Sequence, residues 1–229
     1  MRFFLFAVLI LNACLVQAHP TQESESRLCA PFRGGIVDQD IVKSMLLAAD
    51  EGRLYRIHSA RSSVGFCVDS AIGRVAAEFE NIQGGFALRH ETWGDESQML
   101  VMVDADTLSM EETFIKNMLK SEHFLDTYMY PKILFVSTRL HWFDDRHAVL
   151  EGDLTMHGVT RPVQFDVTVS AVDSRHHGRS VRQGRDDRIV VTAKAFIKRS
   201  DFEMKSLSYL VSDTVELCMR VDAVLHRNK

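Results

Sequence analysis

Histidine is the residue type in this chain best suited to metal binding or proton transfer, because imidazole binds metals readily and titrates near neutral pH. The sequence has ten histidines, and none of them forms an H-x-H or H-E-x-x-H spacing. His176 and His177 are adjacent, so their side chains would point in opposite directions on a strand. A metal site or catalytic base built from histidine would therefore need residues that are scattered along the sequence.

The stretch L-T-M-H-G-V-T-R-P at residues 154–162 places His157 between two segments that alternate apolar and polar residues. Gly158 can supply a positive φ angle at a tight turn, and Pro162 can occupy the first position of a strand, where a missing N–H costs least. We therefore predict a hairpin with His157 at its tip. In that place the histidine would stabilise the turn rather than bind a metal or act as a base.

Other sequence motifs for catalysis are absent from the chain. It has no G-x-S-x-G elbow, no P-loop and no G-x-G-x-x-G dinucleotide fingerprint. The carboxylate pairs Asp144-Asp145 and Asp186-Asp187 lie in polar stretches that are typical of solvated turns. Because the remaining pattern is an apolar interior with few polar groups, the sequence favours a binding protein over an enzyme, with no metal and no cofactor apart from a bound ligand.

The elements that would position such an interior are strands with one apolar face. Val64, Phe66 and Val68 alternate with Gly65 and Cys67, and the same period of two recurs over residues 74–80, 99–103, 150–156, 163–170, 189–195 and 215–222. Strands with one face on the core and one face exposed to solvent are typical of an antiparallel sheet. About eight strands can close into a barrel just wide enough for one ligand, so we predict a mainly β, antiparallel barrel of about eight strands.

Two segments have the helical period instead. Residues 37–50 predict an amphipathic helix that ends before Gly52, with an apolar stripe of Val37, Ile41, Met45 and Leu46. Residues 110–122 predict a second helix, with Ser109 as N-cap and Glu112 completing a capping box. The stripe of this second helix would consist of Phe114, Ile115, Met118 and Leu119.

The first 18 residues indicate an export signal. Arg2 precedes an apolar run that is short for a membrane span, and Val16-Gln17-Ala18 places small residues where a signal peptidase cuts. The alternative is a lipoprotein anchored at Cys14, because L-N-A-C resembles a bacterial lipobox. We divide the chain into a signal peptide at 1–18, an N-terminal extension at 19–52 and a barrel domain at 53–229.

The net charge bears on whether the chain binds nucleic acid, and the cysteine count bears on whether the mature chain forms a disulfide. The net charge of −4 argues against nucleic-acid binding, and we interpret the basic stretch at 175–188 as a solvated loop because glycine and aspartate interrupt it. Cleavage after Ala18 would leave Cys29, Cys67 and Cys218 in an oxidising compartment. Two alternatives stay open: the three cysteines form one disulfide and leave one free thiol, or all three are unpaired.

Several separated segments occur in a specific order. They are Y-R-I-H-S at 55–59 with V-G-F at 64–66, M-L-K-S-E-H-F-L-D at 118–126 with Y-P-K-I-L-F-V-S-T at 130–138, G-D-L-T-M-H-G-V-T-R-P-V at 152–163, K-R-S-D-F at 198–202 and V-S-D-T-V at 211–215. Together, over about residues 54–225, they resemble the YceI-like, polyisoprenoid-binding proteins.

The resemblance implies a lipocalin-like antiparallel barrel. Its apolar channel would hold a long isoprenoid amphiphile, such as a polyprenyl phosphate or a prenyl quinone, for transport, storage or stress response. Export to a bacterial periplasm and the absence of enzyme activity are also implied. The chain departs from the family pattern at Glu203, where glycine is usual and a special backbone angle is expected. The N-terminal extension and the long basic loop at 173–188 are further departures.

Within such a channel we expect apolar side chains to line the lipid tail and cations to meet an anionic head group. The expected lining consists of Val64, Phe66, Phe79, Phe86, Val101, Phe135, Leu154, Phe165, Val167, Leu217 and Met219. The expected head-group residues are Arg61, Lys198 and Arg199. The alternative for the apolar side chains is that they fill the barrel as a solid core.

Three further expectations concern partners. If the first and last strands pair to close the barrel, Cys67 and Cys218 would lie opposite each other within disulfide reach, which leaves Cys29 free or able to link two chains into a homodimer. A long-chain isoprenoid lipid and, peripherally, a membrane surface are the other expected partners. Two different functions stay open: a non-lipid stress or interaction module that uses the helix at 37–50, and a histidine-based metal or catalytic protein at the barrel mouth.

Overall fold

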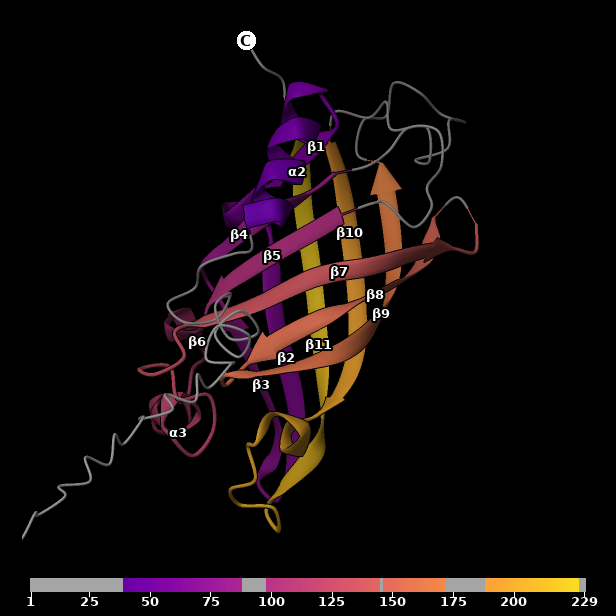
Figure 1. Ribbon diagram of the computed structural model, residues 1–229. Helices are drawn as coiled ribbons and strands as arrows, with labels where there is room; N and C mark the ends of the chain where they lie inside the picture. Colours follow the sequence, from indigo (N-terminus) through magenta and orange to yellow (C-terminus); the bar gives the residue numbers. More distant parts are fainter. Residues whose placement is uncertain (1–38, 88–97, 145, 172–187, 227–229) are drawn as a thin grey trace, which may run out of the picture.

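The computed structural model describes residues 39–87, 98–144, 146–171 and 188–226. The predicted export signal, Cys14, Cys29 and residues 175–187 of the basic stretch lie outside these ranges. Eleven strand segments form one sheet, in the order β1-β4-β5-β7-β8-β9-β10-β11-β2-β3-β6 (Figure 1). Their bounds are β1 Leu54–Ile57, β2 Ser63–Ser70, β3 Gly73–Phe79, β4 Ile82–Ala87, β5 Gln98–Asp104, β6 Leu108–Ser109, β7 Lys132–Trp142, β8 His147–Met156, β9 Val159–Ala171, β10 Arg188–Lys198 and β11 Val211–Leu225.

The sheet closes into a barrel because β1 pairs with both β4 and β11. Beyond a 3-10 turn at Ser59–Arg61 the chain continues as β2, which pairs with β11 as well. Likewise β3 leads into β4, and β5 leads into β6. With each of these three pairs counted as one bent strand, the structure is an eight-stranded antiparallel β-barrel, which confirms the predicted fold class.

The period of two in the sequence decides which side chains enter the barrel. On β10, Ile189, Val191 and Ala193 are buried, whereas Thr192 and Lys194 are exposed. A strand turns successive side chains to opposite faces, so each alternating segment buries one apolar row. The strands predicted from alternation are therefore confirmed.

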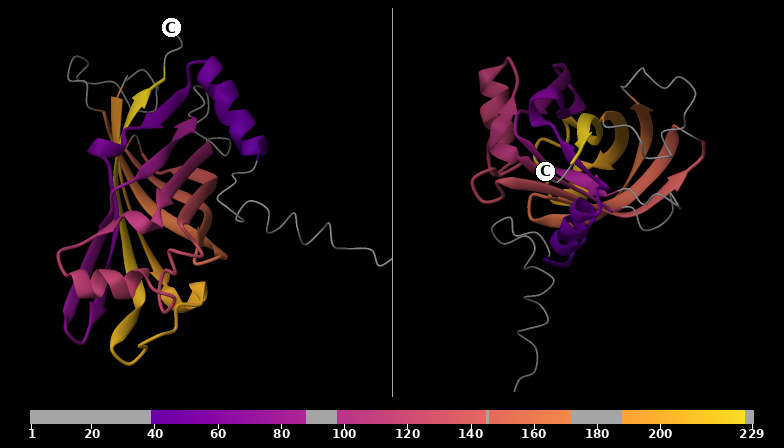
Figure 2. Two further views of the ribbon diagram at one scale, coloured as in Figure 1. Left: turned by 90° about the vertical axis from the view of Figure 1, so that its left-hand side faces the viewer. Right: turned by 90° about the horizontal axis from the view of Figure 1, so that it is seen from above.

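Helix α2 (Gln39–Asp50) lies at one end of the barrel, which we call the α2 end, against β1, β4 and β5 (Figures 1 and 2). The predicted helix is confirmed, but its predicted stripe is wrong at Leu46, which is exposed. Among the side chains of α2 that the structure describes, which exclude those of Val37 and Ile41 from the predicted stripe, Ala48 and Ala49 are buried, because their small size lets the helix approach the strands closely. No helix in the described ranges is long and apolar enough to cross a membrane.

Helix α3 (Thr113–Lys120) lies at the opposite end, the α3 end, as the left view of Figure 2 shows. The predicted capping box is wrong: the helix begins after Glu112, whose side chain makes no capping hydrogen bond. The reason is strand pairing, because Leu108 and Ser109 form β6 beside β3 and cannot also start a helix. Of the predicted stripe, Leu119 is buried, whereas Phe114 is exposed.

Candidate functional site

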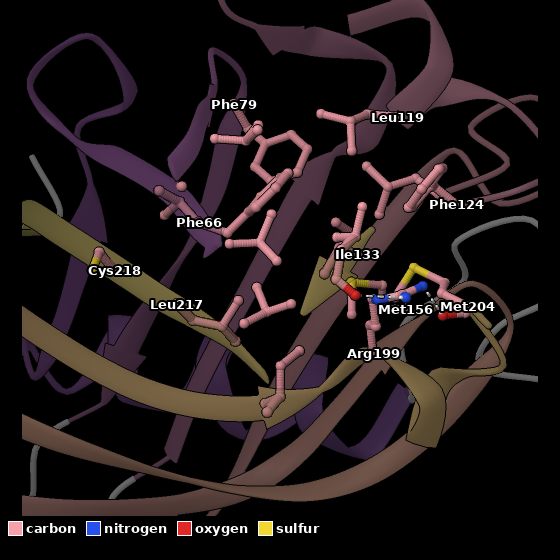
Figure 3. A pocket seen from close by; sticks show the side chains of 18 of the residues that line it. Phe66, Phe79, Leu119, Phe124, Ile133, Met156, Arg199, Met204, Leu217 and Cys218 are labelled. Atoms are coloured by element: carbon pink, nitrogen blue, oxygen red, sulfur yellow. Dashed lines mark hydrogen bonds between the residues drawn. The ribbon is translucent and has the colours of Figure 1, made fainter. Parts of the chain in front are cut away.

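An apolar cavity of about 290 Å³ lies inside the α3 end of the barrel (Figure 3). Strands β2, β3 and β11 form one wall, and α3 with the segment after it forms another. Arg199 is the one charged residue among the described side chains that line the cavity. The volume is close to the lower limit of about 300–1,000 Å³ that is usual for small-molecule sites.

Most of the apolar side chains expected along a lipid tail border this cavity. They are Val64, Phe66, Phe79, Val101, Phe135, Leu154, Phe165, Leu217 and Met219. Phe86 and Val167 do not, and their expected place in the lining is wrong. Both side chains are buried in the packed core, where Phe86 stacks on Tyr55 with ring centroids 5.4 Å apart. Contact of the other nine with a ligand stays a prediction.

A part of the lining was missed from the sequence because it comes from a helix and loops. Ile115, Met118 and Leu119 of α3 face the cavity, and so do Phe124 and Leu125 just after the helix. The helical stripe over 114–119 was a usable signal, since an apolar stripe must pack against something. The loop residues Met204, Leu207 and Leu210 carried no periodic signal at all.

Two pairs of aromatic rings form part of the cavity wall. Phe135 and Phe165 meet edge to face with ring centroids 5.2 Å apart, a favoured aromatic geometry. Gly152 leaves the room for this arrangement, because a Cβ at that position would lie 2.5 Å from Cζ of Phe135. Phe66 and Phe79 form a second, tilted pair with centroids 6.2 Å apart. The rings thus stand along the wall and leave the centre empty.

Arg199 holds the loop at 203–211 with its guanidinium (Figure 3). Its nitrogens donate to the carbonyl oxygens of Met204 at 2.6 Å, Ser206 at 2.6 Å, Val211 at 3.1 Å and Ser212 at 3.0 Å. Burial lowers the pKa of the guanidinium, partly offset by the charge of Asp213. The group fastens this loop to β10 and β11, and its predicted contact with a ligand head group stays a prediction.

The other two expected head-group residues do not border the cavity, so their expected place is wrong. Lys198 is exposed because the alternation on β10 turns Ile197 inward and Lys198 outward. Arg61 lies in the 3-10 turn between β1 and β2, with its Nε 3.6 Å from Oδ2 of Asp222. Asp222 is buried and also accepts hydrogen bonds from Arg188, which holds the pKa of its carboxyl below the usual range.

His157 lies at the tip of the β8–β9 hairpin, as predicted. Its φ is +52° and that of Gly158 is +73°, which is the twisted two-residue turn that suits a hairpin. The imidazole Nδ1 lies 3.0 Å from the carbonyl oxygen of Phe202, to which it donates, and the ring packs on the edge of Tyr130. The histidine therefore ties the hairpin to the 3-10 turn at Arg199–Phe202.

Glu203 follows that 3-10 turn with a φ of +63°, so the special backbone angle expected at this departure from the family pattern is present. A left-handed conformation is strained for a residue with a Cβ. The pKa of the Glu203 carboxyl is lowered, chiefly by its hydrogen bond with Lys205.

The expected opposition of Cys67 and Cys218 is wrong, although their strands do pair. Cys67 is opposite Glu216, and Cys218 is opposite Gly65, so the two thiols are diagonal and are not joined by a disulfide. The pairing with β2 is regular from Val215 to Arg220, so this offset belongs to the regular register of the two strands. In the described residues, no group of three or more His, Cys, Asp or Glu is placed to hold a metal ion.

Comparison with known proteins gives matches in sequence and in fold. A UPF0312 protein of Pseudomonas putida (strain F1) is 34% identical over 108 residues, 45% of this chain and 50% of the relative, so the chain spans about half the length of that relative. BcnA of Burkholderia cenocepacia superposes with a TM-score of 0.63 at 17% identity, covering 73% of this chain and 99% of BcnA. A polyisoprenoid binding domain from Saccharophagus degradans, implicated in plant cell wall breakdown, superposes with a TM-score of 0.57 at 14% identity, covering 75% and 98%. At these identities the two solved structures show a shared fold.

The family model described as the YceI-like domain matches residues 55–223. This range begins in β1 and ends in β11, so it contains every strand of the barrel and both aromatic pairs of the cavity. The chain therefore belongs to the YceI-like family.

Proposed function

We propose that this protein binds a long-chain isoprenoid amphiphile, either a polyprenyl phosphate or a prenyl quinone, with its tail in the cavity at the α3 end. The observation that carries the proposal is a cavity of about 290 Å³ bordered by apolar side chains, within a fold whose interior could have been filled. A ligand without a long apolar part would leave this surface unused. The polyisoprenoid binding domain of S. degradans, which shares the fold, supports the same ligand class.

The free energy of binding would come mainly from the tail. Each buried CH₂ contributes about 0.8 kcal/mol, so affinity should rise with tail length while further units can still enter. The cavity is small for a ligand site, which means that it takes only the first units of a long tail. We therefore expect affinity for a series of prenyl alcohols to rise with length and then level off.

The head group would contribute little. Arg199 is the one charged residue of the described lining, and its guanidinium already donates to four backbone carbonyls. A phosphate would thus find no free cation in the described lining and would stay in water at the mouth. A titration that compares a prenyl phosphate with the alcohol of equal length should give equal affinities. If the phosphate bound tenfold tighter than the alcohol, Arg199 would be assigned to the head group after all.

The experiment that tests ligand class is mass spectrometry of organic extracts from natively purified protein, followed by uptake of an added prenyl quinone. We expect a long-chain isoprenoid in the extract, or stoichiometric uptake where the protein is purified empty. Failure of both measurements would contradict the proposal. A binding role in transport or storage, rather than catalysis, agrees with the lack of an acid–base pair among the described lining residues.

Export is a separate part of the proposal. The apolar run after Arg2 and the small residues before His19 support cleavage after Ala18 and release into the periplasm. The mass of the mature protein decides between this and the lipoprotein alternative. A chain that begins at His19 is expected, whereas a lipid-modified chain that begins at Cys14 would contradict it.

A further inference from the structure

Large apolar side chains are exposed at the α3 end of the barrel. Ile72 in the β2–β3 turn is 78% exposed, Phe114 of α3 is 80% exposed, and Tyr209 and Leu210 of the loop at 203–211 are 82% and 42% exposed. The loop after α3 adds Tyr128 and Met129 at 91% and 64%. Exposed apolar groups from four separate segments at one end of a molecule are typical of an interaction surface.

This surface is the rim of the cavity. Ile72 and Leu210 border the cavity and are exposed at the same time, so they mark its mouth. The backbone joins the two sides, because the amide of Ala71 donates to the carbonyl oxygen of Leu210 at 2.8 Å. Anything that covers the exposed side chains would therefore cover the entrance through which a ligand reaches the interior.

The charges around the mouth indicate which surface would cover it. The β2–β3 turn at 70–73 (S-A-I-G) and the loop tip at 206–212 (S-L-S-Y-L-V-S) contain no charged residue. The exposed charges that flank them form pairs of opposite sign, Asp69 with Arg74 and Glu203 with Lys205. Around α3 the signs are mixed, with Glu111 and Glu112 near Lys116 and Lys120. An apolar, tyrosine-bearing and uncharged edge fits the interface of a neutral bilayer, where tyrosine is favoured, better than a polyanionic surface.

We propose that the α3 end docks on a lipid bilayer, with Ile72, Tyr209 and Leu210 inserted into the boundary between head groups and acyl chains and with the cavity mouth facing the membrane. The choice of a membrane as partner rests on the proposed function, because an isoprenoid ligand resides in a bilayer. The docked barrel lets the tail pass from the acyl layer into the cavity without crossing water.

Flotation with phosphatidylcholine vesicles tests the proposal. The full chain should float with the vesicles, and 30% phosphatidylserine or about 0.5 M salt should change the bound fraction less than twofold, since the inserted edge is uncharged. The double substitution Ile72→Asp and Tyr209→Asp should lower partitioning at least about tenfold, because each carboxylate would have to leave water.

A matched control exists elsewhere on the barrel. Phe143, between β7 and β8, is 68% exposed and does not border the cavity, so Phe143→Asp makes the same kind of chemical change outside the proposed docking surface. It should float like the unchanged chain. Equal loss in the control, or vesicle binding that the double substitution does not change, would overturn the proposal.

Two further measurements separate this inference from the proposed function and from a second copy of the chain as the occupant. Uptake of a prenyl quinone delivered in ethanol without vesicles reports on the cavity alone, and the single variant Tyr209→Asp, whose side chain does not border the cavity, should keep it. Uptake without any vesicle binding would remove the docking proposal and leave the ligand proposal standing, whereas vesicle binding without uptake would do the reverse. A dimer that dissociates on Ile72→Asp, with no flotation of either form, would assign the surface to self-association instead.

Discussion

At the α2 end of the barrel the interior is filled: Tyr55 and Phe86 stack 5.4 Å apart with planes 9° from parallel, and both rings are buried. At the α3 end the same strands, with the same alternation, enclose a cavity of about 290 Å³. The two ends also differ in their surroundings. Helix α2 packs against β1, β4 and β5 near the filled end, whereas α3 and loop residues form part of the cavity wall at the α3 end.

The pairing of β3 explains why a cavity forms at the α3 end. Along its other edge β3 pairs with β6 only at Glu78 and Phe79, so in the described part of the chain residues 73–77 have no strand partner on that side. Side chains of α3 stand where a strand would otherwise continue the barrel wall. A helix and loops cannot interdigitate with the inner rows as a neighbouring strand does, and a cavity remains.

The largest expected contrast comes from removing one ring at each end. Phe86→Ala should lower the free energy of unfolding by about 3–5 kcal/mol, because it empties a filled core. Phe66→Ala should cost only about 1–2 kcal/mol, since that ring is half-buried and already borders an empty space. Urea denaturation followed by circular dichroism measures both. Equal losses would mean that the α3 end is packed as tightly as the α2 end.

The loop at 203–211 offers a second way to destabilise the α3 end without changing the α2 end. Arg199→Met should lower the free energy of unfolding by about 2–4 kcal/mol, because four carbonyl oxygens lose a charged donor. Hydrogen exchange should increase at residues 203–212 before it increases in β4 or α2. Lys198→Met, at the exposed neighbour, is the control and should change neither measurement. Protection retained at 203–212 in the Arg199 variant would show that the loop holds without it.

A larger side chain should have different effects at the cavity wall and in the packed core. Leu217→Trp at the cavity wall should change the free energy of unfolding by less than about 1 kcal/mol, because the added ring has empty space to occupy. It should also lower affinity for a prenyl quinone at least about tenfold, since it displaces several methylenes of the tail. Val167→Trp, at a buried position that does not border the cavity, should do the opposite and cost about 1–3 kcal/mol with unchanged affinity. Loss of stability in the Leu217 variant without loss of affinity would contradict a tail in the cavity.

The period of two predicted the direction of the inner side chains correctly and their depth along the barrel incorrectly. Phe86 and Val167 point inward as expected, yet alternation carries no information on which level of a barrel is filled. Local helix signals failed at Ser109 for a related reason, because the pairing of β6 with β3 outweighs a favourable cap. The register of Cys67 against Glu216 depends on how β2 and β11 pair, which a single strand's sequence does not encode.

A pH-dependent effect separates the two ends by charge. Asp222, near the α2 end, accepts hydrogen bonds from Arg188 and pairs with Arg61, so Asp222→Asn should cost about 1–3 kcal/mol at pH 7. The hydrogen bond of Arg188 lowers the pKa of the folded carboxyl, so its contribution is present above the unfolded pKa of about 3.9 and is lost as the pH falls through the folded value. The gap between the two proteins should therefore be widest at pH 7 and close below about pH 4.

Ligand affinity should not change in the Asp222 variant or in Arg61→Ala, because neither side chain borders the cavity. Unfolding curves at pH 7, 5 and 3, with a prenyl phosphate titration at pH 7, measure both effects. If Arg61→Ala weakened the phosphate alone, the head group would have to reach the outer face of the barrel at the β1–β2 bend. That result would move the binding site away from the α3 end and remove the functional meaning of the difference between the ends.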